Sequence, residues 1–164
     1  MEKKKIAILM GSDSDLPTLK PGIDILKQFG VEYSVRVMSA HRTPKPAAEF
    51  ASTARDKGYG VIIAAAGVAA HLAGAMAAQS TLPVIGIPVS AGALKGLDAL
   101  LSTVQMPPGV PVATVAVDGA LNAALLAVQI LAVYDEDLAG TLDIYKTTMA
   151  ETVAKKDRAI QSEV

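Results

Sequence analysis

Four short segments of this 164-residue chain carry groups that bind anions or move protons, namely hydroxyls, carboxylates, imidazoles and a guanidinium. In chain order these segments are GSDSD at 11–15, SAHRTP at 39–44, AGVAAH at 66–71 and PVSAGALKG at 88–96. Each one follows a short apolar run that is typical of a buried strand. In open parallel sheets, ligands bind beyond the carboxyl ends of the strands, so the four segments are predicted to form one site.

The first segment has two interpretations. Gly11 and Ser12 open a helix directly after a strand, where free N–H groups, the helix dipole and a hydroxyl favour an anion. Alternatively, Ser12, Ser14 or Asp15 simply caps the helix. No Walker lysine follows, which argues against a nucleoside triphosphate site. Asp13 and Asp15 have no third carboxylate nearby, so no metal site is expected.

The second segment places His41 beside Arg42, a titratable imidazole next to a fixed cation for phosphate or carboxylate. Thr43 and Pro44 are explained by a helix start alone, with Thr43 as the cap and Pro44 at the first helical position. That explanation leaves His41 and Arg42 unaccounted for, so a functional role for these two is favoured.

The third segment brings His71 into a stretch, 64–78, that contains nine alanines. Such small side chains let the backbone approach a ligand or another subunit closely. His71 is either a packing histidine or a ligand contact, and the residues alone do not decide between these roles. The two histidines lie thirty positions apart in a chain without cysteine, which argues against a structural zinc site.

Short apolar runs alternate with helix-length segments, the pattern of βαβ units and a parallel sheet, so an α/β fold is predicted. The predicted strands are 5–10, 32–38, 61–65, 83–87 and 111–117. The predicted helices are about 17–29, 45–57, 69–79, 96–105 and 121–134. Pro21 and Gly22 fall inside the first helix, which is therefore expected to start late or to kink there.

The chain is expected to form one catalytic domain over 1–134, followed by a C-terminal tail over 135–164. Apolar residues recur in the tail at spacings of four and three, at Leu138, Leu142, Tyr145, Met149 and Val153. This stripe predicts a terminal helix with one apolar face, which packs either on its own domain or on a neighbouring subunit.

Composition narrows the class of protein. Hydrophobic residues make up 51% of the chain and charged residues 19%, which excludes disorder. A net charge of −1 leaves no basic excess for nucleic acid, and the absence of cysteine excludes disulfides and thiolate chemistry. No apolar run has the length of a signal or membrane segment, so a cytoplasmic protein is expected. The mean hydropathy of +0.39 predicts apolar surface buried between subunits.

The ordered motifs resemble the N5-carboxyaminoimidazole ribonucleotide mutase family (class I PurE) of purine biosynthesis. The resemblance runs from Ile6 to about Tyr145 and rests on MGSDSD at 10–15, SAHRTP at 39–44, AAHL at 69–72, VQMP at 104–107 and NAALLA at 122–127. It implies a flavodoxin-like three-layer αβα sandwich with a five-stranded parallel sheet and a C-terminal helical extension, assembled as a homo-octamer. The family's reaction moves a carboxylate from the exocyclic nitrogen to ring carbon C4 without ATP, metal or organic cofactor.

By the same resemblance, His41 is the general acid/base, and Ser12, Asp15 and Arg42 bind the ribonucleotide, with Arg42 and the helix N-terminus near its phosphate. The complete set expected to bind substrate is Gly11, Ser12, Asp15, Ser39, Ala40, Arg42, Ala66, Gly67, His71 and Leu72. A small pocket lined by alanine and glycine would hold the released CO2 and exclude water.

The third segment departs from the family pattern, because Ala65 and Val68 replace glycines and Ala73 replaces a proline. If position 68 takes a positive φ, a valine there is strained, and the shape of the CO2 pocket is affected. Two alternatives stay open: a related carboxylase that uses free CO2, and a nucleotide-binding oligomer without catalysis. The carboxylase branch usually lacks the AAHL run found at 69–72.

Overall fold

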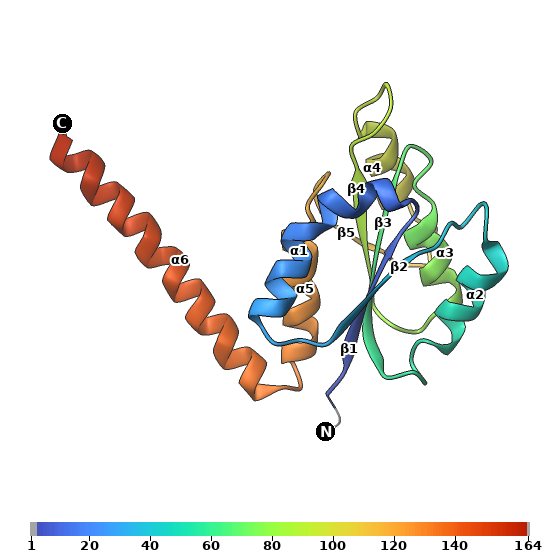
Figure 1. Cartoon of the computed structure of the whole chain (residues 1–164), viewed down its shortest axis with the longest axis horizontal. Helices are drawn as coiled ribbons and strands as arrows, with labels where there is room; N and C mark the ends of the chain where they lie inside the picture. Colours follow the sequence, from blue (N-terminus) through green and yellow to red (C-terminus); the bar gives the residue numbers. More distant parts are fainter. Residues whose placement is uncertain (1–2, 164) are drawn as a thin grey trace.

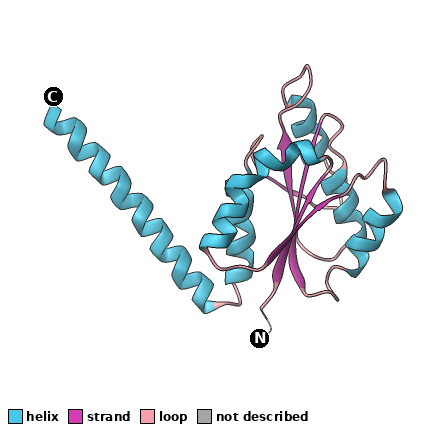
Figure 2. Ribbon diagram, viewed as in Figure 1, coloured by secondary structure: helices cyan, strands magenta, loops and turns pink. Residues whose placement is uncertain are grey.

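A five-stranded parallel sheet forms the centre of the protein, as a computed structural model that describes residues 3–163 shows (Figures 1 and 2). The strands lie in the order β2-β1-β3-β4-β5. Their bounds are β1 (Lys5–Met10), β2 (Tyr33–Val37), β3 (Tyr59–Gly67), β4 (Val84–Val89) and β5 (Ala113–Thr114). Because all pairs are parallel, the carboxyl ends of the strands meet at one edge of the sheet.

Helices cover both faces of this sheet (Figure 1). The helical elements are a short 3-10 helix, η1 (Asp13–Asp15), and α1 (Leu16–Gln28), α2 (Pro44–Thr53), α3 (Leu72–Gln79), α4 (Leu97–Val104), α5 (Ala120–Ala132) and α6 (Glu136–Glu163). Helices α1 and α5 pack on one face, and α2, α3 and α4 pack on the other. The predicted flavodoxin-like three-layer αβα sandwich is confirmed.

Alternate residues of each central strand point to opposite cores. In β1, Ile6 and Ile8 join the core beneath α1 and α5, while Ala7 and Leu9 join the core beneath α2 and α3. All four side chains are at most 3% exposed. Burial on both faces explains why β1, β3 and β4 are continuous apolar runs rather than alternating apolar and polar residues.

The first helix crosses Pro21 without starting late, so that part of the prediction is wrong. Helix α1 begins at Leu16 and includes Pro21, whose ring removes one backbone donor. The adjacent Gly22 allows α1 and α5 to approach closely, because a Cβ there would lie 2.5 Å from the carbonyl oxygen of Ala120. The glycine is thus required by the packing of two helices.

Three predicted boundaries are wrong for identifiable reasons. Strand β5 has two residues instead of seven, because it lies at the sheet edge and follows Pro111, which has no N–H. Strand β3 is longer than predicted and continues to Gly67, which pairs with Val89. Helix α3 begins at Leu72 rather than Ala69, because the preceding residues form a loop at the sheet edge.

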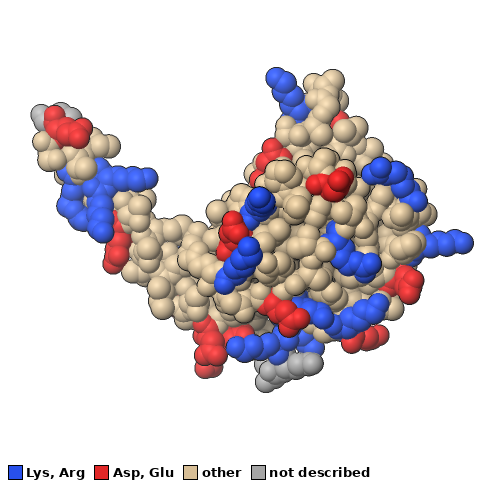
Figure 3. Space-filling view, in the orientation of Figure 1, with Lys and Arg blue, Asp and Glu red and all other residues tan. Residues whose placement is uncertain are grey.

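Helix α6 packs on its own domain only over its first turns. Leu142 is buried, and the ring of Tyr145 lies 5.6 Å from that of Phe29. Beyond this contact the helix projects away from the sheet, with Met149 47% and Val153 66% exposed (Figure 1). Lysine and arginine side chains gather near its far end (Figure 3). No helix within residues 3–163 is both long enough and apolar enough to cross a membrane.

Candidate active site

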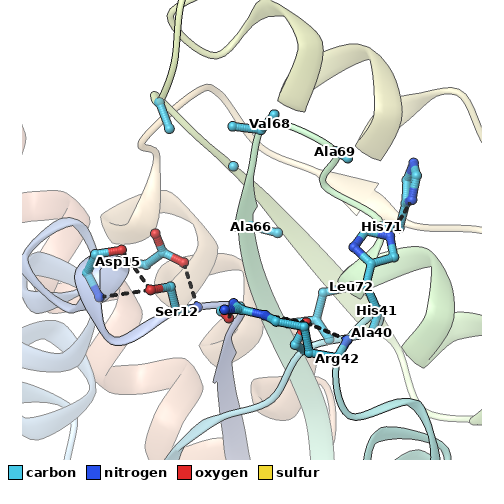
Figure 4. A pocket seen from close by; sticks show the side chains of 15 residues that line it. Ser12, Asp15, Ala40, His41, Arg42, Ala66, Val68, Ala69, His71 and Leu72 are labelled. Carbon is cyan, nitrogen blue, oxygen red and sulfur yellow. Dashed lines mark hydrogen bonds between the residues drawn. The ribbon is translucent and has the colours of Figure 1, made fainter.

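The loops at the carboxyl edge enclose a pocket of about 250 Å³ (Figure 4). Its wall contains every residue expected at the site: Gly11, Ser12, Asp15, Ser39, Ala40, His41, Arg42, Ala66, Gly67, His71 and Leu72. Ser12 and Asp15 lie on one side of the pocket, the two histidines lie on the other, and Arg42 lies between them (Figure 4). The fold therefore brings together side chains from loops that are up to sixty residues apart in the chain.

In the loop after β1, side chains cap the short helix η1. The Ser12 hydroxyl accepts a hydrogen bond from the N–H of Ser14, and the Asp15 carboxylate accepts one from the N–H of Ser12, which together make a capping box. The capping interpretation is confirmed, although the cap belongs to η1 and not to α1. These N–H groups already have acceptors, and the Ser12 hydroxyl itself donates to the Asp13 carboxylate at 3.2 Å. An anion here therefore depends on rotation of the Ser12 hydroxyl and on a nearby cation.

Arg42 is that cation, and two neighbours direct it into the pocket. Its Nη2 donates to the carbonyl oxygen of Gly11 at 3.0 Å, and its Nε donates to the Ser39 hydroxyl at 3.4 Å. These contacts link the loops after β1 and β2. A guanidinium has five N–H donors, so the others remain for a bound phosphate or carboxylate.

Thr43 occupies the cap position of α2, with Pro44 as the first helical residue, as predicted. Its hydroxyl does not cap the helix, however. It accepts a hydrogen bond from the N–H of Ser39 and donates to the carbonyl oxygen of Ser39, each at 3.0 Å. The side chain therefore closes the 39–43 loop, which is the loop that orients His41 and Arg42.

The two histidines contact each other directly. Nε2 of His41 lies 2.9 Å from Nδ1 of His71, and the rings meet edge to face with centroids 5.0 Å apart. Both residues are exposed and line the pocket, so His71 is not buried in the core of its own chain. The contact requires one ring to donate and the other to accept, so the pair holds a single proton between its rings.

Asp15 is the acidic residue of the pocket that is shielded from solvent. Burial raises the pKa of its carboxyl above the ordinary value of 3.8, the hydrogen bond from the N–H of Ser12 opposes the rise, and Asp13 adds to it. Ionisation of Asp15 therefore costs free energy of desolvation, and a hydrogen-bond donor on a ligand would reduce that cost.

Hydrogen bonds from helix α4 fix the loop after β3, which carries Ala70 and His71. The Ser102 hydroxyl accepts a hydrogen bond from the N–H of Ala70 at 3.1 Å, and the Thr103 hydroxyl lies 3.4 Å from the carbonyl oxygen of Ala70. Two tight turns precede His71, in which the N–H of Ala70 also bonds to Val68 and that of His71 bonds to Ala69. The position of His71 therefore depends on α4.

Four residues of the pocket wall are absent from the set expected from the sequence: Ser14, Val68, Ala69 and Ala91. Ala91 comes from the segment after the fourth strand, whose place at the carboxyl edge was a usable signal. Val68 has φ +57°, which agrees with the strain expected for a valine at this position. Within residues 3–163, histidine, aspartate and glutamate side chains form no group of three or more able to hold a metal ion.

The fold and the pocket define an α/β protein with a pocket of ligand size at the carboxyl edge of its sheet, where two histidines are hydrogen-bonded to each other. Residues 5–152 match the model of the AIR carboxylase family, and the chain belongs to that family.

Known proteins are similar to this chain over nearly its whole length. An N5-carboxyaminoimidazole ribonucleotide mutase of Pyrococcus abyssi is 54% identical over 145 residues, which cover 88% of this chain and 83% of that protein. The chloroplastic phosphoribosylaminoimidazole carboxylase of Vigna aconitifolia is 51% identical over 92% of this chain, which spans 27% of that longer protein. The crystal structure of PurE from Treponema denticola superposes with a TM-score of 0.85 at 30% identity, covering 94% of this chain and 97% of that one.

Proposed function

We propose that the chain is an N5-carboxyaminoimidazole ribonucleotide mutase that converts its substrate to 4-carboxy-5-aminoimidazole ribonucleotide. The observation that carries the proposal is an identity of about half over nearly the whole chain to several relatives of that name. The pocket contains groups suited to this reaction: a directed cation, a shielded carboxylate and a histidine pair.

The ribonucleotide lies along the loops after β1 and β2. Its phosphate takes the remaining N–H donors of Arg42 and the hydroxyl of Ser12. The ribose hydroxyls donate to the carboxylate of Asp15, which compensates the cost of its burial. This arrangement directs the imidazole ring toward His41 and His71.

His41 gives one proton and takes another. Its Nε2 is bonded to His71, and its Nδ1 has no hydrogen-bond partner in the described part of the chain. In the acid form, His41 is protonated on both nitrogens: Nε2–H donates to Nδ1 of His71, and Nδ1–H acts as an acid toward the carbamate nitrogen. Loss of that proton leaves a neutral His41 that still donates from Nε2 to His71, and its Nδ1 is then a base. Nδ1 thus gives one proton and takes another while the bond to His71 is kept.

The reaction proceeds in two balanced steps. Protonation of the carbamate nitrogen breaks its bond to the carboxylate carbon and releases CO2, with the bonding electrons staying on nitrogen. Ring carbon C4 then attacks CO2 to form the new carbon–carbon bond, and the C4 proton returns to His41. Ala40, Ala66 and Gly67 leave room for CO2 beside the ring and offer it no nucleophile.

The same proposal includes self-association and a cytoplasmic location. Helix α4 leaves Leu97, Leu101 and Val104 about half exposed, and the distal half of α6 leaves Met149 and Val153 exposed. Apolar surface of this extent favours burial between copies of the chain, and a homo-octamer is the assembly expected. Sedimentation of the purified protein measures this, and a monomer at working concentration would contradict it.

The test of the function is conversion of N5-carboxyaminoimidazole ribonucleotide by the purified full chain without ATP. We expect product in proportion to enzyme, and His41→Asn should bind substrate but lose about 10²- to 10⁴-fold in turnover. The carboxylase name of the Vigna relative makes a free-CO2 carboxylase the second candidate. Faster product formation from aminoimidazole ribonucleotide and bicarbonate than from the carbamate would establish it. Binding without any product would identify a non-catalytic oligomer.

A further inference from the structure

Val68 is a β-branched residue in a backbone conformation that such residues rarely adopt. Its φ is +57°, in the left-handed region, and its side chain is 52% exposed. Burial of the side chain therefore does not account for the conformation. Two hydrogen bonds next to Val68 account for its positive φ. The carbonyl oxygen of Val68 accepts a bond from the N–H of Ala70, and that N–H also donates to the hydroxyl of Ser102 in α4.

This conformation aims the side chain at the loop after β4. A Cβ on Gly92 would lie 3.5 Å from Cγ2 of Val68, and a Cβ on Gly67 would lie 3.0 Å from Cβ of Ala91. The two loops therefore meet beside the pocket, and Val68 and Ala91 both line it. Val68 supplies an apolar surface at the upper wall in Figure 4, on the side away from Arg42.

We infer that Val68 is a retention wall, a side chain that closes the gap between the loops after β3 and β4 and keeps released CO2 in the pocket. The inference rests on the proposed function, because such a wall has an effect only in a reaction that passes through released CO2. CO2 is small and apolar, so an apolar side chain blocks its escape without offering a competing nucleophile. Val68 forms no bond with a reacting atom, and its effect is on the fate of CO2.

The experiment measures how released CO2 divides between escape into solution and attack by ring carbon C4. The full-length protein receives substrate with a 13C-labelled carboxylate in excess unlabelled bicarbonate. NMR gives the ratio of labelled bicarbonate released to label at ring carbon C4. Wild-type protein should release little. Val68→Ala removes the wall but keeps a side chain at positive φ, and we expect the ratio to rise about threefold or more.

Two further variants separate the wall from the backbone. Val68→Thr keeps the branched shape and should retain label as wild type does. Val68→Gly also removes the wall but relieves the backbone, so it should release label as Val68→Ala does. Val133→Ala, at an exposed position outside the pocket, is the matched control and should leave the ratio unchanged. Urea unfolding of each variant records stability separately.

The outcomes are distinct. Release that rises only in Val68→Gly shows that the backbone matters and not the wall, and it overturns the inference. A wild-type ratio in Val68→Ala also overturns it, while leaving the proposed function intact. Wild-type product that contains only unlabelled carboxylate contradicts the mutase itself, and the inference fails with it.

Discussion

Replacement of Ser102 by alanine tests whether α4 positions the catalytic loop. The hydroxyl accepts the N–H of Ala70 at 3.1 Å and donates to the carbonyl of Asp98 at 2.7 Å. Ala70 is 1% exposed, so no water replaces the lost acceptor. Its N–H keeps the bond to Val68 at 3.0 Å, which places the loss of stability at the lower end of the range, about 1 kcal/mol.

The effect on catalysis should exceed the effect on stability. Ala70 directly precedes His71, whose Nδ1 lies 2.9 Å from Nε2 of His41. Misplacement of a reacting group by about 1 Å can reduce the rate by up to about 100-fold. We expect a fall in kcat of about tenfold with little change in KM, because the phosphate-binding loops are untouched. Urea unfolding and steady-state kinetics at pH 7.5 measure the two quantities.

Ser52→Ala is the matched control for this prediction. Ser52 is also a helical serine that bonds to a backbone carbonyl, that of Glu49, but it lies exposed on α2 outside the pocket. It should change neither quantity, and Ser102→Thr, which restores the hydroxyl, should recover kcat. A Ser102→Ala variant that loses stability but keeps wild-type kcat would refute the idea that α4 positions His71.

Three further variants test other parts of the account. Arg42→Ala should weaken substrate binding about 10- to 100-fold and lower stability by no more than about 1 kcal/mol, because both side-chain hydrogen bonds of Arg42 are exposed. Arg36, whose guanidinium lies over the ring of Phe50, is the control, and Arg36→Ala should bind substrate normally. Equal affinities of the two variants in calorimetry would remove Arg42 from the phosphate site. Asp15→Asn removes a carboxyl whose pKa is raised in the folded state, so wild-type stability falls as pH rises from about 3.8 through that raised pKa. The variant should therefore gain stability relative to wild type at pH 7, and urea titrations in which the gain grows on acidification would contradict this. Gly22→Ala should destabilise by about 1–3 kcal/mol against the carbonyl of Ala120, whereas Gly140→Ala, with open space around it, should stabilise by up to about 1 kcal/mol; thermal unfolding distinguishes the two.

The arrangement of the sheet and its helices was predictable from the sequence because the three central strands, β1, β3 and β4, are short apolar runs that are largely buried. The same pattern identified which loops share the carboxyl edge, since parallel strands all end there. Family motifs added the roles of individual residues. The pocket contains every residue of the expected substrate-binding set, whereas the segment 88–96 contributes Ala91 alone.

The remaining features depend on tertiary contacts that no local pattern reveals. Alanine-rich sequence predicted a helix from Ala69, but bonds from α4 and the positive φ of Val68 keep those residues in a loop. The contact between His41 and His71 depends on the relative position of two loops that meet only in the folded sheet. Gly22 looked like a helix breaker and is instead required by the approach of α5.

A crossover experiment tests most directly the claim that carboxylate transfer is confined to one pocket. The enzyme receives an equimolar mixture of two substrates, one with 13C in the carboxylate and the other with 15N in the imidazole ring, and mass spectrometry resolves the products. The account predicts products that carry 13C or 15N but not both, since each CO2 returns to the ring that released it. Doubly labelled product at the level expected for free mixing would contradict it.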